Sequence, residues 1–220
     1  MTANDQYVAA LTMAGPPSPD APSRLGDHDF PSRRIDHDAL QRAARELLHA
    51  IGADVEAAAF AETPRRVADA YSELLTPQPF RATSFPNDHG YDELIVARAI
   101  PFHSLCMHHL LPFHGVAHIG YLPGERIVGL SKLGRVVEFF SRDLQIQERL
   151  TTQIADWLQI QLDPKGVGVV LEAEHLCMSL RGVQKLGAKT VTSALRGLVR
   201  EDPLTRQEFV ALTTRTDHDD

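Results

Sequence analysis

The stretch FHSLCMHHLLPFHG, from Phe102 to Gly115, carries one of the chain's two cysteines among four histidines. The segments on either side of it, YDELIVARAI and HGVAHIGYL, have the composition and alternation typical of β-strands. We therefore predict that the Cys-His stretch is the loop or turn that joins two strands. Ordinary core packing gives no reason for so many imidazoles beside a thiol, so this connection is also the first candidate for a functional site.

Beyond this connection the hydrophobic pattern becomes helical and then returns to strands. Two groups of apolar residues recur at helical spacing, namely Leu133, Val136, Val137 and Phe140, and then Leu150, Ile154, Trp157, Leu158 and Leu162. The segments VGVVLEAEHLCMSLRG and KTVTSALRGLV that follow are predicted strands. The order strand, strand, helix, helix, strand, strand predicts an α+β domain, in which an antiparallel sheet carries its helices on one side.

The part of the chain before this domain has a different composition. Residues 1–31 are rich in proline and alanine and are predicted to be a disordered tail. Residues 32–90 are predicted to form a helical region and a connecting loop, with one helix from Asp38 and a second capped by Thr63 with Pro64 in its first turn. Residues 91–220 then form a single functional domain.

Composition excludes several classes of protein. No run approaches 18 consecutive apolar residues, and the first residues lack the pattern of a secretory signal, so we expect a cytoplasmic protein with no membrane partner. A net charge of −7 argues against a nucleic-acid-binding surface. Because the cytosol keeps thiols reduced, two cysteines in such a chain are more often a metal or catalytic pair than a disulfide.

The cysteines and histidines have spacings that suit a metal ion. Cys106 and His109 have the C-x-x-H spacing of a turn that offers sulfur and nitrogen to one ion, and Cys177 would complete a Cys2His set of the kind used by catalytic zinc. If the segment around Cys177 is a strand, its side chain and that of His175 share a face. A fourth protein ligand, His108 or His175, would make the site structural instead. A disulfide and a Cys-His nucleophile remain alternatives, although the second leaves one cysteine without a role.

Three other sequence patterns are weaker evidence for a functional site. Ser131 and Lys132 at a predicted helix start, with Arg135 one turn later, form either a phosphate cradle or a solvated helix face. GVQKLGAKT is not a Walker A loop, because an alanine separates its second glycine from the lysine and a strand follows. Glu148, at the start of the second predicted helix, is adequately explained as a favourable charge at a helix N-terminus.

Four segments together resemble GTP cyclohydrolase I: SLCMHHLLPFHG, GLSKLGRVVEFFSRDLQIQERLT, EAEHLCMSLRGV and KTVTSALRG. The resemblance covers roughly residues 36 to 214 in the family's order and spacing. It implies a T-fold domain, with an antiparallel four-stranded sheet, two long helices on one side and an N-terminal helical extension. It also implies a toroidal homodecamer of two pentamers, with active sites at subunit interfaces.

The resemblance also assigns roles by position. It implies Zn²⁺ bound by Cys106, His109 and Cys177, with His108 and His175 as catalytic histidines. The residues expected to bind the substrate, GTP, are Gln147 and Glu148 at the guanine and Ser131, Lys132, Arg135, Arg181 and Arg66 at the ribose and triphosphate. A local basic cluster is needed, because GTP carries a charge of roughly −4 and the protein is itself negative.

The implied reaction is the first step of pterin and tetrahydrofolate biosynthesis. Water attacks C8 of GTP while His175 protonates N7, a second hydrolysis releases formate, and the ribose opens, rearranges and recloses to give 7,8-dihydroneopterin triphosphate. His108 suits the proton transfers on the ribose side. Met107 stands where the family usually has glutamate, and Gln184 and Leu186 replace a basic residue and a proline. The alternatives are therefore a T-fold paralogue that takes another purine nucleotide or stops at the ring-opened formamidopyrimidine, and a noncatalytic zinc- or nucleotide-binding scaffold.

Overall fold

The computed structural model describes residues 34–214, so the predicted tail over residues 1–31 lies outside the described residues. A five-stranded sheet has the order β5-β2-β3-β6-β7. Its strands are β2 (Ile95–Cys106), β3 (Pro112–Leu122), β5 (Leu144–Gln145), β6 (Gly166–His175) and β7 (Lys189–Gly197). The four long strands are antiparallel neighbours, which confirms the predicted sheet. The short β5 was not predicted and pairs in parallel with the end of β2.

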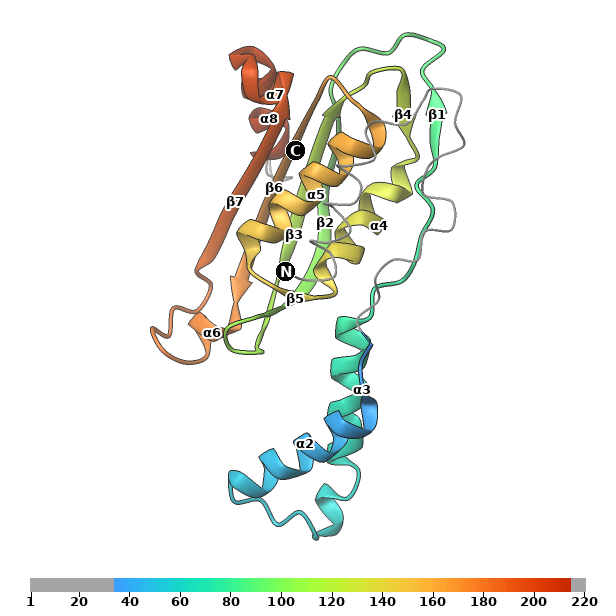
Figure 1. The fold of residues 1–220 in the computed structure, drawn as a ribbon. Coiled ribbons are helices and arrows are strands. Elements are labelled where there is room, and N and C mark those ends of the chain that lie inside the picture. Colours follow the sequence, from blue (N-terminus) through green and yellow to red (C-terminus); the bar gives the residue numbers. More distant parts are fainter. Residues whose placement is uncertain (1–33, 215–220) are drawn as a thin grey trace, which may run out of the picture.

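Two long helices, α4 (Leu130–Ser141) and α5 (Gln147–Leu162), cover one face of this sheet (Figure 1). Their apolar residues are the ones whose spacing predicted helices, and Leu133, Val136, Ile154 and Trp157 are completely buried. Burial of these side chains against the sheet supplies the main hydrophobic stabilisation of the domain. The predicted T-fold arrangement, with both helices on one side of an antiparallel sheet, is confirmed.

The C-terminal segment packs where β6 begins and β7 ends. It contains α7 (Leu198–Glu201) and α8 (Pro203–Thr214), which the sequence pattern did not predict. The buried ring of Phe209 on α8 rests on Gly120 and Gly168, where a Cβ atom would come within 2.7 and 2.6 Å of the ring. Glycine at these two strand positions therefore makes room for the helix.

The N-terminal helices project away from the sheet (Figure 1). They are α2 (His37–Ala50), the 3₁₀ turn η1 (Ala58–Phe60) and α3 (Thr63–Leu75), followed by a two-stranded sheet of β1 (Ser84–Pro86) and β4 (Arg126–Val128). The predicted helical extension is confirmed, but Thr63 is the first residue of α3 and Glu62 precedes it as the cap. β1 falls inside the segment that was predicted to be a loop.

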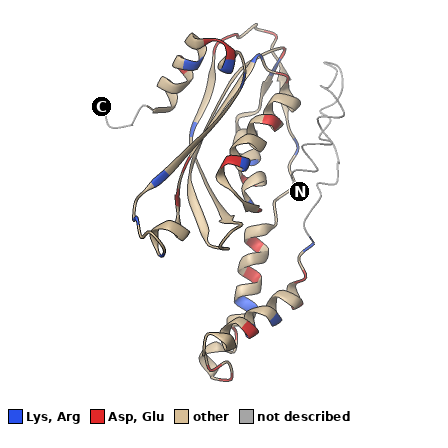
Figure 2. Ribbon diagram, turned by 60° about the vertical axis from the view of Figure 1, so that its left-hand side comes forward, with Lys and Arg blue, Asp and Glu red and all other residues tan. Residues whose placement is uncertain are grey.

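Charge is mixed over the surface, with basic and acidic residues side by side on the helices (Figure 2). Among residues 34–214, no helix has both the length and the apolar character needed to span a bilayer.

Candidate active site

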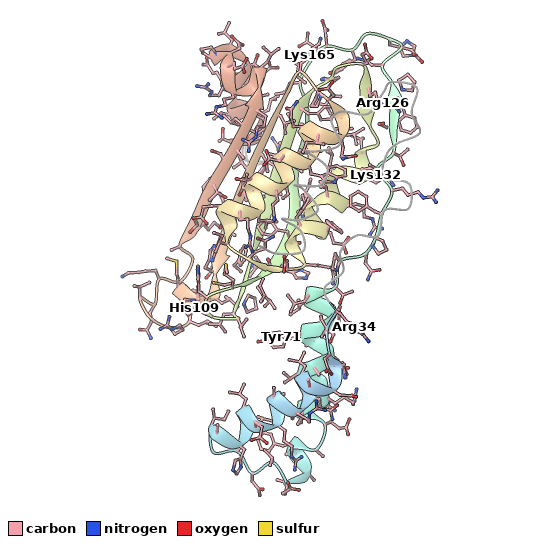
Figure 3. The ribbon with its side chains drawn as sticks, viewed as in Figure 1. Arg34, Tyr71, His109, Arg126, Lys132 and Lys165 are labelled. Atoms are coloured by element: carbon pink, nitrogen blue, oxygen red, sulfur yellow. The ribbon has the colours of Figure 1, made fainter. Side chains whose placement is uncertain are left out.

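Three side chains that could hold a metal ion meet at the end of the sheet where β2, β3 and β6 meet α6 (Leu176–Ser179). The ligand atoms of Cys106, His109 and Cys177 all lie within 4.8 Å of one another. Both thiols are buried and free, whereas His109 is exposed at the tip of the domain (Figure 3). These are the three residues that the sequence predicted as ligands, and the structure brings them together although the cysteines are far apart in the chain.

A tight turn between β2 and β3 brings His109 onto Cys106. β2 continues through Cys106 and β3 begins at Pro112, so the connection is shorter than predicted. The backbone N–H of Cys106 donates to the carbonyl of Leu111 at 2.9 Å, and its own carbonyl accepts from Leu110 at 2.8 Å. This geometry places Sγ of Cys106 3.8 Å from Nδ1 of His109. The strand β5 holds the turn from the side, since Met107 N–H donates to the carbonyl of Gln145 at 3.0 Å.

Cys177 reaches the site by a different route from the one predicted. The prediction of a strand through Cys177 is wrong, because β6 ends at His175 and the chain continues as the one-turn helix α6. The argument that His175 and Cys177 share a strand face therefore fails. The helical turn folds the chain back toward the β2–β3 connection, and this brings the thiol to Cys106.

The chemistry of the donor set fits zinc. Burial raises the pKa of the Cys177 thiol, and the neighbouring Cys106 raises it further, while Arg181 acts in the opposite direction. Two buried sulfurs side by side are therefore poor thiolates unless a cation compensates them. Two thiols and an imidazole are ligands that Zn²⁺ prefers. Among residues 34–214, these three form the group of side chains close enough to share an ion, and they would hold it.

Two further histidines lie beside this group. Nδ1 of His108 is 3.8 Å from Sγ of Cys106, because the β2–β3 connection is a tight turn. His175 ends β6 and its ring stacks on Phe113, with centroids 4.6 Å apart. Burial lowers the pKa of His175, and the nearby carboxylate of Glu148 partly opposes this.

Glu148 and Arg181 flank the site with opposite charges. Glu148 is exposed in the first turn of α5, as its sequence position predicted. Arg181 follows α6, and its Nη1 lies 3.4 Å from Nε2 of His109. The site therefore combines a sulfur–imidazole group, two histidines, one carboxylate and one guanidinium.

Comparison with known proteins agrees with this geometry. Residues 40–214 match the family model described as GTP cyclohydrolase I. The chain belongs to the GTP cyclohydrolase I family. It is 50% identical over 190 residues to GTP cyclohydrolase 1 of Mycobacterium leprae, covering 83% of this chain and 92% of that protein. It is 48% identical over 190 residues to GTP cyclohydrolase 1 of Mycobacterium tuberculosis, with 83% and 93% coverage.

A solved structure, the archaeosine synthase QueF-Like in the apo form, matches with a TM-score of 0.37 and 13% sequence identity. The match covers 49% of this chain and 94% of that chain. No conclusion is drawn from a similarity this low. The family membership confirms the resemblance seen in the sequence, and with it the expectation of an enzyme.

Not every residue expected in a GTP cyclohydrolase I site lies near the thiols of the same chain. Ser131, Lys132 and Arg135 lie on α4, and Figure 3 shows Lys132 well away from His109. Ser131 and Arg135 line a separate cavity of about 550 Å³ beside β2 and β3. Arg66 is exposed on α3, in the projecting extension.

Two contacts of His175 were not predicted from the sequence, one with Phe113 and one with Gln147. Phe113, which stacks on His175, looks in the sequence like any strand residue. Gln147 was expected at the guanine, but it is buried and its side chain bonds to His175 and to the sheet. Its spacing to Leu150, Thr151 and Ile154, on the buried face of α5, is the pattern from which this burial could have been found.

Proposed function

We propose that this member of the family uses zinc to open the imidazole ring of GTP by hydrolysis, releasing formate and giving 7,8-dihydroneopterin triphosphate. One observation carries the proposal: two buried thiols and an imidazole, from segments far apart in the chain, gather beside two further histidines. Cys106, His109 and Cys177 would hold the metal. When bound, zinc lowers the pKa of a water ligand from 15.7 to about 7 and thereby supplies a nucleophile at neutral pH.

The two remaining histidines are the proposed proton carriers. His175 would give a proton to N7 of the guanine as the imidazole ring opens, and His108 would move protons on the ribose side. The nearby carboxylate of Glu148 favours the protonated ring that this donation requires, and it partly opposes burial, which lowers the pKa of His175.

Substrate binding is proposed to use both charges at the site. Glu148 presents an exposed carboxylate, which would accept hydrogen bonds from the N–H edge of guanine. Arg181, beside His109, would meet the triphosphate.

We further propose that neighbouring copies complete the site in a homodecamer. Ser131, Lys132, Arg135 and Arg66 are the cations and hydroxyl expected at the triphosphate, yet in one chain they lie on α4 and α3, away from the thiols. An assembly that brings these helices of one copy to the sheet end of another would supply the missing positive charge. The free thiols suit a reducing compartment, so the cytoplasm is the proposed location.

The test is an assay of purified protein for formate and for the fluorescent pterin after addition of GTP. Zinc-loaded protein is expected to release both products, and protein stripped with a chelator is expected to release neither until zinc is restored. Mass spectrometry of the products distinguishes the alternative. A ring-opened nucleotide that accumulates without pterin would contradict the full reaction, and absence of formate would contradict catalysis altogether.

A further inference from the structure

Gln147 connects the start of α5 to His175. It is the first residue of the helix and only 2% exposed. Its Oε1 lies 2.8 Å from Nε2 of His175. A buried amide that bonds to a histidine at an active site restricts how that histidine can be oriented and protonated.

The surroundings of Gln147 fix which way its amide points. Its nitrogen lies 3.1 Å from the carbonyl of Leu171 and 2.9 Å from the carbonyl of Thr190. Carbonyl oxygens only accept, so the NH₂ group must face them and the amide oxygen must face the imidazole. Nε2 of His175 is therefore the donor in this hydrogen bond, and Nε2 carries a proton in the neutral and the charged ring alike.

Two threonines extend the same network. The hydroxyl of Thr151 donates to the carbonyl of Gln147 at 2.7 Å, and it lies 2.6 Å from the hydroxyl of Thr192. Because Thr151 has a single hydroxyl proton, Thr192 donates in that contact and accepts from the Gln147 amide at 3.1 Å. The two amide protons of Gln147 are shared among three acceptors, the carbonyls of Leu171 and Thr190 and the hydroxyl of Thr192, and the amide is held between α5, β6 and β7.

The orientation of the His175 ring is also restrained by an aromatic contact. Phe113 stacks on it with ring planes 2° from parallel. The stack fixes the plane of the imidazole, and the Gln147 hydrogen bond fixes its rotation within that plane. Nδ1 is the remaining ring nitrogen, and it is the one that can exchange a proton with a bound molecule.

We propose that Gln147 is a positioning residue that holds His175 with Nε2 protonated and Nδ1 available to the substrate. The inference rests on the proposed role of His175 in proton transfer. It differs from the guanine contact that the resemblance implied for Gln147. To reach a base, the amide would have to leave the buried carbonyl of Leu171 and its partly buried partners on β7, and buried groups without hydrogen-bond partners are costly.

The two roles predict different kinetics. Replacing Gln147→Met keeps the length of the side chain and removes its hydrogen bonds. If Gln147 positions His175, kcat falls about 10- to 100-fold, while the KM for GTP stays within about 3-fold and zinc content is unchanged. If Gln147 instead contacts guanine, KM rises with little change in kcat. This second result, or an unchanged kcat, would overturn the inference.

Gln159→Met is the matched control. Gln159 lies near the other end of α5, and its amide donates to the carbonyl of Pro164 at 3.1 Å, so the same change is made on the same helix away from His175. Its kcat is expected to be that of the parent protein. Gln147→Asn is the second variant in case Gln147→Met does not fold; it keeps an amide but is one methylene too short, so it too should lower kcat without raising KM.

A double-mutant cycle separates failure of this inference from failure of the proposed function. If Gln147 acts through His175, adding Gln147→Met to His175→Ala should lower the residual rate, measured over long incubations, by less than about 3-fold. An equal loss in both backgrounds would overturn the inference while leaving His175 catalytic. Full activity of His175→Ala alone would instead show that the proposed role of His175 is wrong.

Discussion

Phe113 and His175 are directly paired residues on β3 and β6, and their rings lie 4.6 Å apart and 2° from parallel. Since Phe113 is completely buried, its ring is a fixed surface against which the histidine is held. Phe113→Leu is expected to lower kcat several-fold with little change in KM, and to lower the free energy of unfolding by about 1 kcal/mol for the lost ring contact. Steady-state kinetics and thermal unfolding measure the two effects.

The control for this change is Phe140→Leu. Phe140 lies on α4, is also completely buried, and packs against the ring of Phe139 with centroids 5.2 Å apart. A similar loss of stability with an unchanged kcat is expected. If both variants lower kcat equally, the effect is one of general stability, and the stack has no special role.

Cys177→Ser and His175→Ala should have different effects on metal content. Serine replaces a soft sulfur ligand by a hydroxyl, so Cys177→Ser is expected to purify with little zinc and without activity. His175→Ala should keep about one zinc per chain and lose turnover, because the ligand group does not include it. Elemental analysis of the purified variants gives the ratio of zinc to protein chains. Equal zinc loss in both would mean that His175 is a ligand.

The sheet and the closeness of Cys106 to His109 could be predicted because each depends on local pattern. Strand alternation and helical spacing located β2, β3, α4 and α5, and the C-x-x-H spacing placed Cys106 beside His109. The route of Cys177 could not be predicted, because the pattern of EHLC is compatible with a strand. In the structure β6 ends at His175, and α6, which contacts β3, carries the cysteine.

Glu148→Gln should weaken recognition of guanine. The exposed carboxylate at the start of α5 accepts from two N–H groups in the proposed complex, whereas an amide turns one acceptor into a donor. The KM for GTP is expected to rise at least 10-fold. Glu208→Gln, an exposed position on α8 at the other end of the domain, is the control with an unchanged KM. An unchanged KM in Glu148→Gln would dismiss the guanine contact.

The role of a buried polar residue is harder to predict from sequence than a ligand spacing. Gln147 and Glu148 are neighbours, yet one is buried and the other exposed, because successive helix positions face different directions. The spacing of Gln147 to Leu150 and Ile154 indicates burial. Its partners Leu171, Thr190 and His175 lie on β6 and β7, and no local pattern connects them to α5.

His118 should make stability depend on pH on the acidic side. It lies half-buried on β3, and its Nδ1 accepts from the N–H of Ala99 at 3.4 Å, where β2 bulges and Ala99 has a φ of 53°. Burial lowers the pKa of His118 below 6.5; Glu172 opposes this and Arg98 adds to it. Protonation would also remove the acceptor for Ala99.

The sign of the effect follows from the lowered pKa. Below pH 6.5 the unfolded chain takes up a proton at His118 more readily than the folded chain, so the stabilisation present above pH 6.5 is lost as the pH falls through the lower, folded-state pKa. His118→Gln, which does not titrate, should flatten the fall in stability as the pH decreases below 6.5. Denaturant unfolding followed by circular dichroism at several pH values measures the slope, and an identical slope in both proteins would show that other groups cause it.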